Sequence, residues 1–121
     1  MKNVNAAECR EIIQNHPYVV IKFGNKWCKP CATLSRTIDA LSDAFPNIRF
    51  LEIDTTEDLA YAKEFDVTNI PALFFAAHGS FVTKDDGTKK RLKGVVDSIQ
   101  LREEFTRLQN ILVDDNQGVK N

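Results

Sequence analysis

Residues 18–31 read YVVIKFGNKWCKPC, an apolar stretch followed by a short polar loop and two cysteines three positions apart. The almost continuous apolar run over 18–23, closed by a Gly-Asn pair, is typical of a strand that is buried on both faces of a sheet. Pro30 has no backbone N–H and fits the first turn of a helix. The stretch therefore predicts a buried strand, a turn, and a helix with Cys28 and Cys31 at its N-terminus.

Strands and helices are expected to alternate along the rest of the chain, because short apolar runs are separated by segments whose apolar residues recur at helical spacing. The expected helices span residues 5–16, 30–44, 55–65 and 98–112, and the expected strands span residues 18–23, 48–54, 72–77 and 89–93. Strand–helix–strand units indicate parallel pairing, and Asp85-Asp86-Gly87 indicates a hairpin before the last strand. The sequence thus predicts an α/β fold with a central mixed sheet of four to five strands, flanked by helices on both faces.

Two of the expected helices begin at recognisable capping residues. Asn5, with Glu8 three residues later, predicts a capping box at the first helix, and Ser98 is expected to cap the last one. The apolar stripe expected on the last helix consists of Leu101, Phe105, Leu108 and Leu112.

Length and composition indicate one globular domain. The chain has 121 residues, of which 43% are hydrophobic and 27% are charged, an ordinary globular balance. The domain is expected to span residues 1–112, followed by a polar, flexible tail over 113–121. The formal net charge of −1 argues against nucleic acid or an anionic membrane as the main partner. No apolar run approaches the roughly 20 residues of a membrane span.

The cysteine count fits a reducing compartment. Residues 1–11 are too polar for a secretory signal, so the protein is expected in the cytoplasm. Thiols stay reduced there, and the three cysteines are therefore not expected to form a structural disulfide framework. Cys9 lies on the apolar face of the first expected helix, and a buried inert thiol is favoured over a regulatory one.

The pair of Cys28 and Cys31 suits thiol–disulfide exchange. Unpaired N–H groups and the dipole at a helix N-terminus favour an anion, so Cys28 is expected to be the attacking thiolate. Cys31 lies one turn further on and is placed to attack the sulfur of Cys28 and resolve a mixed disulfide. A zinc site is the alternative, but it needs a second ligand pair, and neither His16 nor His78 has ligand spacing. A metal is therefore not expected. No bound cofactor is expected either, because the electrons for a dithiol–disulfide cycle arrive from a partner protein.

The run Trp27-Cys28-Lys29-Pro30-Cys31 resembles the W-C-G-P-C motif of the thioredoxin family at every position but one. Residues 50–54 resemble the third strand of that family, residues 67–72 resemble its V-x-x-I/M-P-T segment, and Gly94 resembles the glycine after its last strand. The resemblance covers residues 18–112 and implies a thioredoxin fold.

The resemblance also implies a role for each matching residue. Cys28 would be the nucleophile, Cys31 the resolving thiol, and Pro71 a cis-proline that faces the pair. The residues expected to form the substrate-binding surface are Trp27, Pro30, Ile70, Pro71 and Gly94.

The implied function is the reduction of disulfides in other proteins. The partners would be disulfide-containing proteins and an NADPH-dependent reductase that restores the dithiol. The protein is expected to be a monomer that binds neither nucleic acid nor membrane. Two alternatives remain open. One is a tryparedoxin-like or isomerase-like dithiol oxidoreductase with a more oxidising potential, and the other is a thioredoxin-fold module that binds partners with little turnover.

Lys22 stands where the family usually has a buried Asp, which assists proton removal from the resolving thiol. Three interpretations are open. The lysine side chain reaches solvent along the strand, or it pairs with a carboxylate such as Glu52, or it is partly neutral and acts as the base itself. In each case the resolution of the mixed disulfide is expected to be affected.

The segment between Pro71 and Gly94 is several residues longer than is usual in the family. Residues 78–87 are expected to form an extended hairpin or loop within it. Surface loops tolerate added length, so a neutral insertion is the favoured interpretation.

Lys29 replaces the family's glycine between the two cysteines. A cation there is expected to stabilise the Cys28 thiolate and to make the dithiol a weaker reductant than one with the W-C-G-P-C motif. The alternative is a solvated lysine with little effect, because exposed charges are well screened.

Replacement of Lys29 by glycine is therefore expected to make the reduction potential of the dithiol more negative. The change amounts to about 30 mV for every tenfold shift in the thiol–thiolate equilibrium. The measurement is an equilibrium titration of wild type and Lys29→Gly against a glutathione redox buffer. Equal potentials would show that the lysine does not influence the dithiol.

Overall fold

The computed structural model describes residues 1–113 of the chain. Most of the expected flexible tail over 113–121 lies outside these described residues. Within them, no helix is long and apolar enough to cross a membrane.

A six-stranded mixed sheet forms the centre of the described domain, with the order β1-β3-β2-β4-β5 and with β6 paired to β4. The strands are β1 (Lys2–Asn3), β2 (Tyr18–Gly24), β3 (Ile48–Asp54), β4 (Ala72–Ala77), β5 (Ser80–Phe81) and β6 (Arg91–Lys93). The mixed sheet is confirmed, but it has more strands than the four to five predicted. The two extra strands, β1 and β5, are only two residues long, which is too short for an apolar periodicity to reveal them.

Strand β2 is the central strand of this sheet. It pairs in parallel with β3, with Tyr18 opposite Ile48, and antiparallel with β4, with Tyr18 opposite Ala77. All of its residues after Tyr18 are buried, as expected for a strand with helices over both faces.

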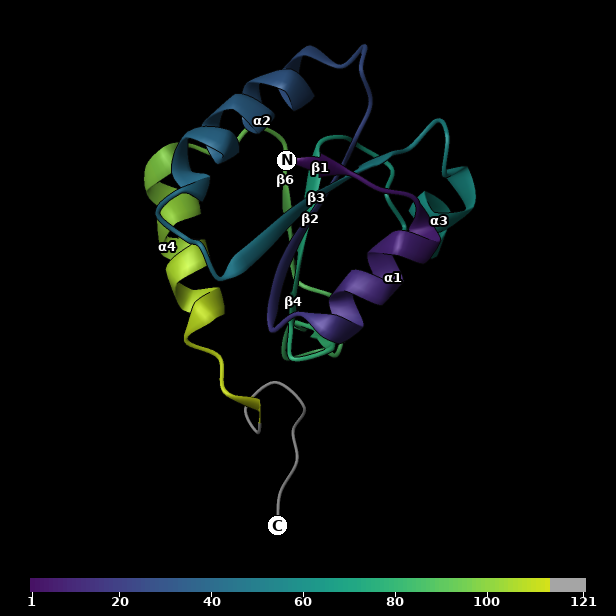
Figure 1. Cartoon of the computed structure of the whole chain (residues 1–121). Coiled ribbons are helices and arrows are strands. Elements are labelled where there is room, and N and C mark those ends of the chain that lie inside the picture. The colour runs from purple at the N-terminus through teal and green to yellow at the C-terminus, as the bar shows by residue number, and fades with distance from the viewer. Residues whose placement is uncertain (114–121) are drawn as a thin grey trace.

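Among the described residues, four helices cover the two faces of the sheet, as predicted. They are α1 (Ala6–Asn15), α2 (Lys29–Ser42), α3 (Leu59–Glu64) and α4 (Ser98–Gln109). Helices α1 and α3 lie on one side of the sheet, and α2 and α4 lie on the other (Figure 1).

Each face of the sheet has its own apolar core. The core under α1 and α3 contains an aromatic group in which Phe23 contacts Tyr61, Phe65 and Phe74. The core under α2 and α4 has Phe105 at its centre, in edge-to-face contact with Phe45 and Phe50.

The helix ends agree in part with the sequence signals. The capping box of Asn5 and Glu8 is confirmed, with both reciprocal hydrogen bonds present. The last helix is capped by Asp97, whose side chain accepts from the Gln100 N–H, so the prediction of Ser98 as the cap was wrong by one residue. The helix ends at Gln109, and Leu112 is exposed and does not extend the apolar stripe.

The segment over residues 78–87 contains two tight turns. His78 and Gly79 both have positive φ angles and form the two-residue turn between β4 and β5, a geometry that hairpins favour. A second turn follows at residues 84–88, where Gly87 has a φ of 87°. The expected extended hairpin is therefore present, and its returning strand β6 begins at Arg91 rather than at residue 89.

The sheet order brings three chain segments together at one edge of the sheet, namely the edge formed by the C-terminal ends of β2 and β3. Strands β2 and β3 run in parallel, so their last residues, Gly24 and Asp54, lie side by side at the same edge. Strand β4 runs in the opposite direction and starts at this edge, with Ala72 opposite Phe23. The loop after β2 and the residues before β4 are thereby placed next to each other.

Removal of the Phe105 ring is expected to lower the free energy of unfolding by about 3–5 kcal/mol, because the ring is fully buried between two other aromatic rings. The matched control is Ile99→Ala on the same helix, where the side chain is 71% exposed, and we expect a change within about 0.5 kcal/mol. Chemical denaturation of Phe105→Ala and Ile99→Ala measures both. Similar losses from the two variants would contradict the assignment of this core.

Candidate active site

Cys28 and Cys31 form a disulfide at the N-terminus of α2, with their Cα atoms 5.2 Å apart. Cys28 is the N-cap residue of the helix, and its Sγ accepts a hydrogen bond of 3.2 Å from the Cys31 N–H. Cys31 is buried, whereas Cys28 is partly exposed. Of the two sulfurs, that of Cys28 is therefore the one that an approaching protein would meet first.

The electrostatics at this helix end favour a negative sulfur at Cys28. Its Sγ lies against a backbone N–H that has no partner within the helix, at the positive end of the helix dipole. The first turn of α2 contains no acidic residue, and Pro30 occupies its start. Lys29 lies exposed between the two cysteines and adds a positive charge. The geometry agrees with an attacking thiolate at Cys28.

Trp27 presents its ring to solvent immediately before the disulfide, with 71% of the residue exposed. Its backbone N–H donates to Asn25 Oδ1 at 3.0 Å, and the Lys26 ammonium lies 4.9 Å from the ring centroid. A large exposed aromatic ring held beside a reactive group is typical of a docking surface.

The Ile70–Pro71 peptide bond is cis and lies just before β4. Strand pairing sets Ala72 opposite Phe23, so Pro71 lies at the edge of the sheet from which the cysteine loop departs. The Pro71 carbonyl accepts a hydrogen bond of 2.9 Å from the Gly94 N–H. Residues predicted to act together are thus joined at one edge of the sheet, although they lie far apart in the sequence.

Lys22 is fully buried, so the interpretation in which its side chain reaches solvent was wrong. Its ammonium donates two hydrogen bonds of 2.6 Å, one to Glu52 Oε2 and one to Ser35 Oγ. The pairing with Glu52 is the arrangement that the structure has. The reason is the strand register, which places Glu52 on β3 directly opposite Lys22 on β2.

Two residues near the pair were missed by the sequence analysis. Ser35 lies four positions after Cys31 on the same face of α2, a helical spacing that would have revealed it. Gly24 approaches the side chain of Cys31 so closely that a Cβ there would lie 3.0 Å from the sulfur and 3.5 Å from Lys22 Nζ. No sequence signal indicated this contact, because it depends on the packing of α2 on β2.

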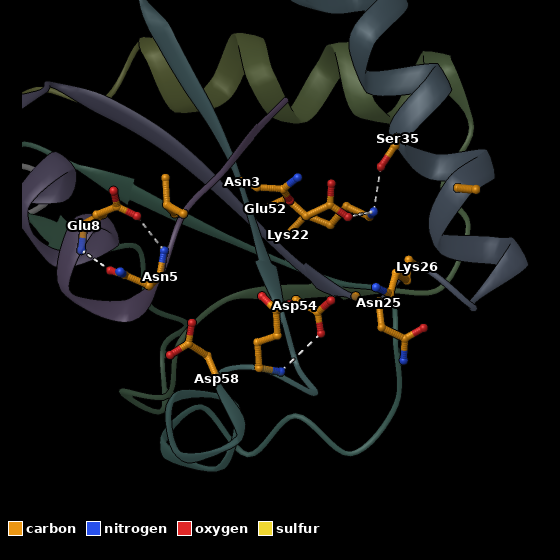
Figure 2. A pocket seen from close by; sticks show the side chains of 14 residues that line it. Asn3, Asn5, Glu8, Lys22, Asn25, Lys26, Ser35, Glu52, Asp54 and Asp58 are labelled. Atoms are coloured by element: carbon orange, nitrogen blue, oxygen red, sulfur yellow. Dashed lines mark hydrogen bonds and ion pairs between the residues drawn. The ribbon is translucent and has the colours of Figure 1, made fainter.

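A polar cleft of about 560 Å³ lies beside this cluster (Figure 2). Ser35 reaches it from α2, Lys22 from β2 and Glu52 from β3 (Figure 2). The other charged side chains that line it are Glu8, Lys26, Asp54, Glu57 and Asp58. Within residues 1–113, no group of three or more His, Cys, Asp or Glu side chains is arranged to hold a metal ion.

A disulfide at a helix N-terminus, between a buried and a partly exposed cysteine, is an arrangement that suits thiol–disulfide exchange. The family model for thioredoxin matches residues 1–100 of this chain. This match covers most of the sequence, so the chain belongs to the thioredoxin family, as its motifs predicted.

Three relatives show how similar the chain is to other thioredoxins. Mitochondrial Thioredoxin-3 of Saccharomyces cerevisiae is 32% identical over 98 residues, which cover 79% of this chain and 77% of that protein. Thioredoxin H2 of Arabidopsis thaliana is 32% identical over 66% of this chain and 60% of its own length. Thioredoxin-2 of Pyricularia oryzae is 32% identical over 64% of this chain. The matched region spans about half (46%) of the length of that relative.

Solved structures agree with this assignment. Oxidised mitochondrial thioredoxin 3 from Saccharomyces cerevisiae superposes with a TM-score of 0.76 and 26% identity, covering 89% of this chain and 95% of that one. Thioredoxin from Fasciola hepatica gives a TM-score of 0.76 and 26% identity, covering 89% of this chain and 99% of that one.

Cys9, the third cysteine, is a buried free thiol on α1. The Tyr61 hydroxyl donates a hydrogen bond of 3.6 Å to its sulfur. Burial raises the pKa of the Cys9 thiol, and burial also raises the pKa of the Tyr61 hydroxyl. A protonated thiol with no exposed surface is a poor nucleophile, which agrees with a structural role.

The raised pKa of Cys9 predicts how stability depends on pH. The unfolded thiol loses its proton at a lower pH than the folded one, so the contribution of Cys9 to the free energy of unfolding is fully present below about pH 8.5 and is lost as the pH rises above that value. Denaturation of the oxidised protein at several pH values measures this slope. In Cys9→Ala the decrease between about pH 8.5 and 10 should shrink, and an unchanged slope would assign it to other groups.

Proposed function

We propose that the protein is a protein-disulfide reductase that acts through Cys28 and Cys31. The observation that carries the proposal is the position of Cys28, partly exposed at a helix N-terminus with its Sγ against the Cys31 N–H. Family membership supports the same chemistry. A cycle between dithiol and disulfide needs no bound cofactor, because the electrons come from another protein.

The reaction proceeds in two exchange steps. The Cys28 thiolate attacks a disulfide in the substrate, forms a mixed disulfide, and releases one substrate sulfur as a thiolate. Cys31 then attacks the sulfur of Cys28, which releases the second substrate sulfur and leaves the Cys28–Cys31 disulfide. An NADPH-dependent reductase returns two electrons to this disulfide and restores the dithiol.

The substrate is proposed to dock at the sheet edge around the disulfide. Trp27 precedes the cysteines and Pro30 lies between them. Ile70 and Pro71 lie just before β4, and the Gly94 N–H donates to the Pro71 carbonyl. Ile70 precedes the start of β4, and this favours an extended substrate segment that binds to the backbone there. Disulfide-containing proteins with an accessible extended segment are therefore the proposed substrates.

A reducing compartment suits this activity, and we assign the protein to the cytoplasm as a monomer. The relatives named above include a mitochondrial protein, and a reducing organelle would meet the same requirement.

A second candidate function is a dithiol protein with a more oxidising potential, of the tryparedoxin-like or isomerase-like kind. The exposed Lys29 favours it, because a cation beside Cys28 stabilises the reduced form through its thiolate. A binding module with little turnover is the weaker alternative, because both cysteines are present and are close enough to form a disulfide.

The Cys31→Ser variant tests the main proposal. Its Cys28 still attacks substrates, but no second thiol resolves the mixed disulfide, so covalent complexes with substrate proteins should accumulate. They are measured on non-reducing gels and identified by mass spectrometry after release with dithiothreitol. In parallel, wild type with a reductase and NADPH should reduce insulin, and Cys31→Ser should not turn over.

Two controls make the result specific. Cys28→Ser should capture no protein, and Cys9→Ser should behave like wild type because its thiol is buried. The reductase function is contradicted if wild type does not reduce insulin and Cys31→Ser captures nothing. Capture without turnover by wild type would favour the binding module.

A further inference from the structure

Lys22 is the one charged residue that is buried within the part of the chain that the structure describes. Its partner Glu52 is 22% exposed and reaches the polar cleft (Figure 2). A buried ion pair loses hydration energy, and apolar side chains of similar volume often stabilise a fold as well or better. The stability of the sheet therefore does not explain why this pair lies here.

Gly24 separates the Lys22 ammonium from the resolving sulfur by about the width of one methyl group. A Cβ on Gly24 would lie 3.0 Å from Cys31 Sγ and 3.5 Å from Lys22 Nζ. The three atoms nearest to this position include none from Glu52. The positive end of the ion pair therefore faces Cys31, and because Lys22 itself is fully buried, its charge is screened less than an exposed one.

The charged residue between the two cysteines and the other charged groups that line the cleft are more exposed than Lys22. Lys29 lies on α2 itself, and the remaining groups come from α1, the loop after β2, β3 and the loop before α3. These groups are Glu8, Lys26, Asp54, Glu57 and Asp58. Each is exposed or partly exposed, so water and salt screen it more than they screen Lys22.

We propose that Lys22 is an electrostatic positioning residue for the resolving step, in which its ammonium stabilises the negative charge that develops on Cys31 Sγ. Glu52 and Ser35 hold the ammonium in place. This inference rests on the proposed reductase function. This chain has no carboxylate at position 22 that could accept the proton of Cys31. In the proposed mechanism a fixed cation stabilises the Cys31 thiolate instead.

The resolving step balances without any group beyond those named. The S–H bond of Cys31 breaks and its proton passes to solvent. The Cys31 sulfur forms a bond to the Cys28 sulfur, while the bond between Cys28 and the substrate sulfur breaks. The substrate sulfur leaves as a thiolate with the electron pair. Lys22 and Glu52 are not consumed.

The titration of Cys31 tests the inference directly. In a Cys28→Ser background, the remaining thiols are Cys31 and Cys9, and the alkylation rate of Cys31 as a function of pH gives the midpoint of its ionisation. Mass spectrometry distinguishes it from the buried Cys9. The variants are Lys22→Met, which removes the cation alone, and the double variant with Glu52→Gln, which removes both charges and keeps the volume. Lys26→Met is the matched control, because it removes an exposed cation from the same cleft.

The charges predict a definite order of midpoints. The midpoint should be lowest with Lys22 present, higher in the double variant, and highest in Lys22→Met, where Glu52 is left without its cation. Lys26→Met should leave it unchanged. In single-turnover resolution with Cys28 present, below the midpoint, the rate should fall about threefold for each unit of upward shift, because the lost thiolate is partly offset by higher nucleophilicity.

A packing role for Lys22 predicts a different result. The inference is overturned if Lys22→Met has the wild-type midpoint, or if the double variant shifts as far as Lys22→Met. The double variant is expected to fold, since apolar replacement of a buried pair is often neutral. The Cys31 titration requires no substrate, so a failed insulin assay with the expected midpoints would reject the reductase function and leave the charge effect standing.

Discussion

Strand β2 is hydrogen-bonded along both edges and covered by helices on both faces, and the rest of the molecule is arranged around it. Its residues from Val19 onward are buried, so each side chain must be apolar or must find a partner inside the protein. Phe23 meets this requirement in the aromatic core. Lys22 meets it through Glu52, which the parallel register with β3 places directly opposite.

The active site follows from where this strand ends. Gly24 closes β2 and allows α2 to pack against it, which brings the side chain of Cys31 onto the end of the strand. The antiparallel partner β4 starts at the same edge and delivers the cis Ile70–Pro71 bond to it. The disulfide therefore lies where a helix N-terminus, the end of a parallel strand pair and the start of an antiparallel strand meet.

Two lysines distinguish this site from the usual sequence of the family. Their charges are screened by solvent to different extents, because one lysine is exposed and the other is buried. Lys29 is exposed beside the attacking cysteine, and water weakens its influence. Lys22 is enclosed beside the resolving cysteine, where its charge is balanced by a carboxylate that lies toward the cleft. In the proposed mechanism, Lys29 would act on the formation of the mixed disulfide, and Lys22 on its resolution. The net charge of −1 for the whole chain conceals this local arrangement.

The sequence by itself determined the fold class, the cysteine pair and most of the element boundaries, because apolar periodicity, the capping box at Asn5 and the W-C-x-P-C motif are local signals. It did not determine β1 or β5, since two-residue strands exist only through their pairing with neighbours. It also left three interpretations open for Lys22, because the choice among solvent, an ion pair and a neutral amine depends on which residue lies opposite on β3. The contact between Gly24 and Cys31 was likewise decided only in the tertiary structure. The partner of Lys22 and the contact between Gly24 and Cys31 depend on strand register and on packing between elements. A local sequence pattern carries no information about which residues these bring together.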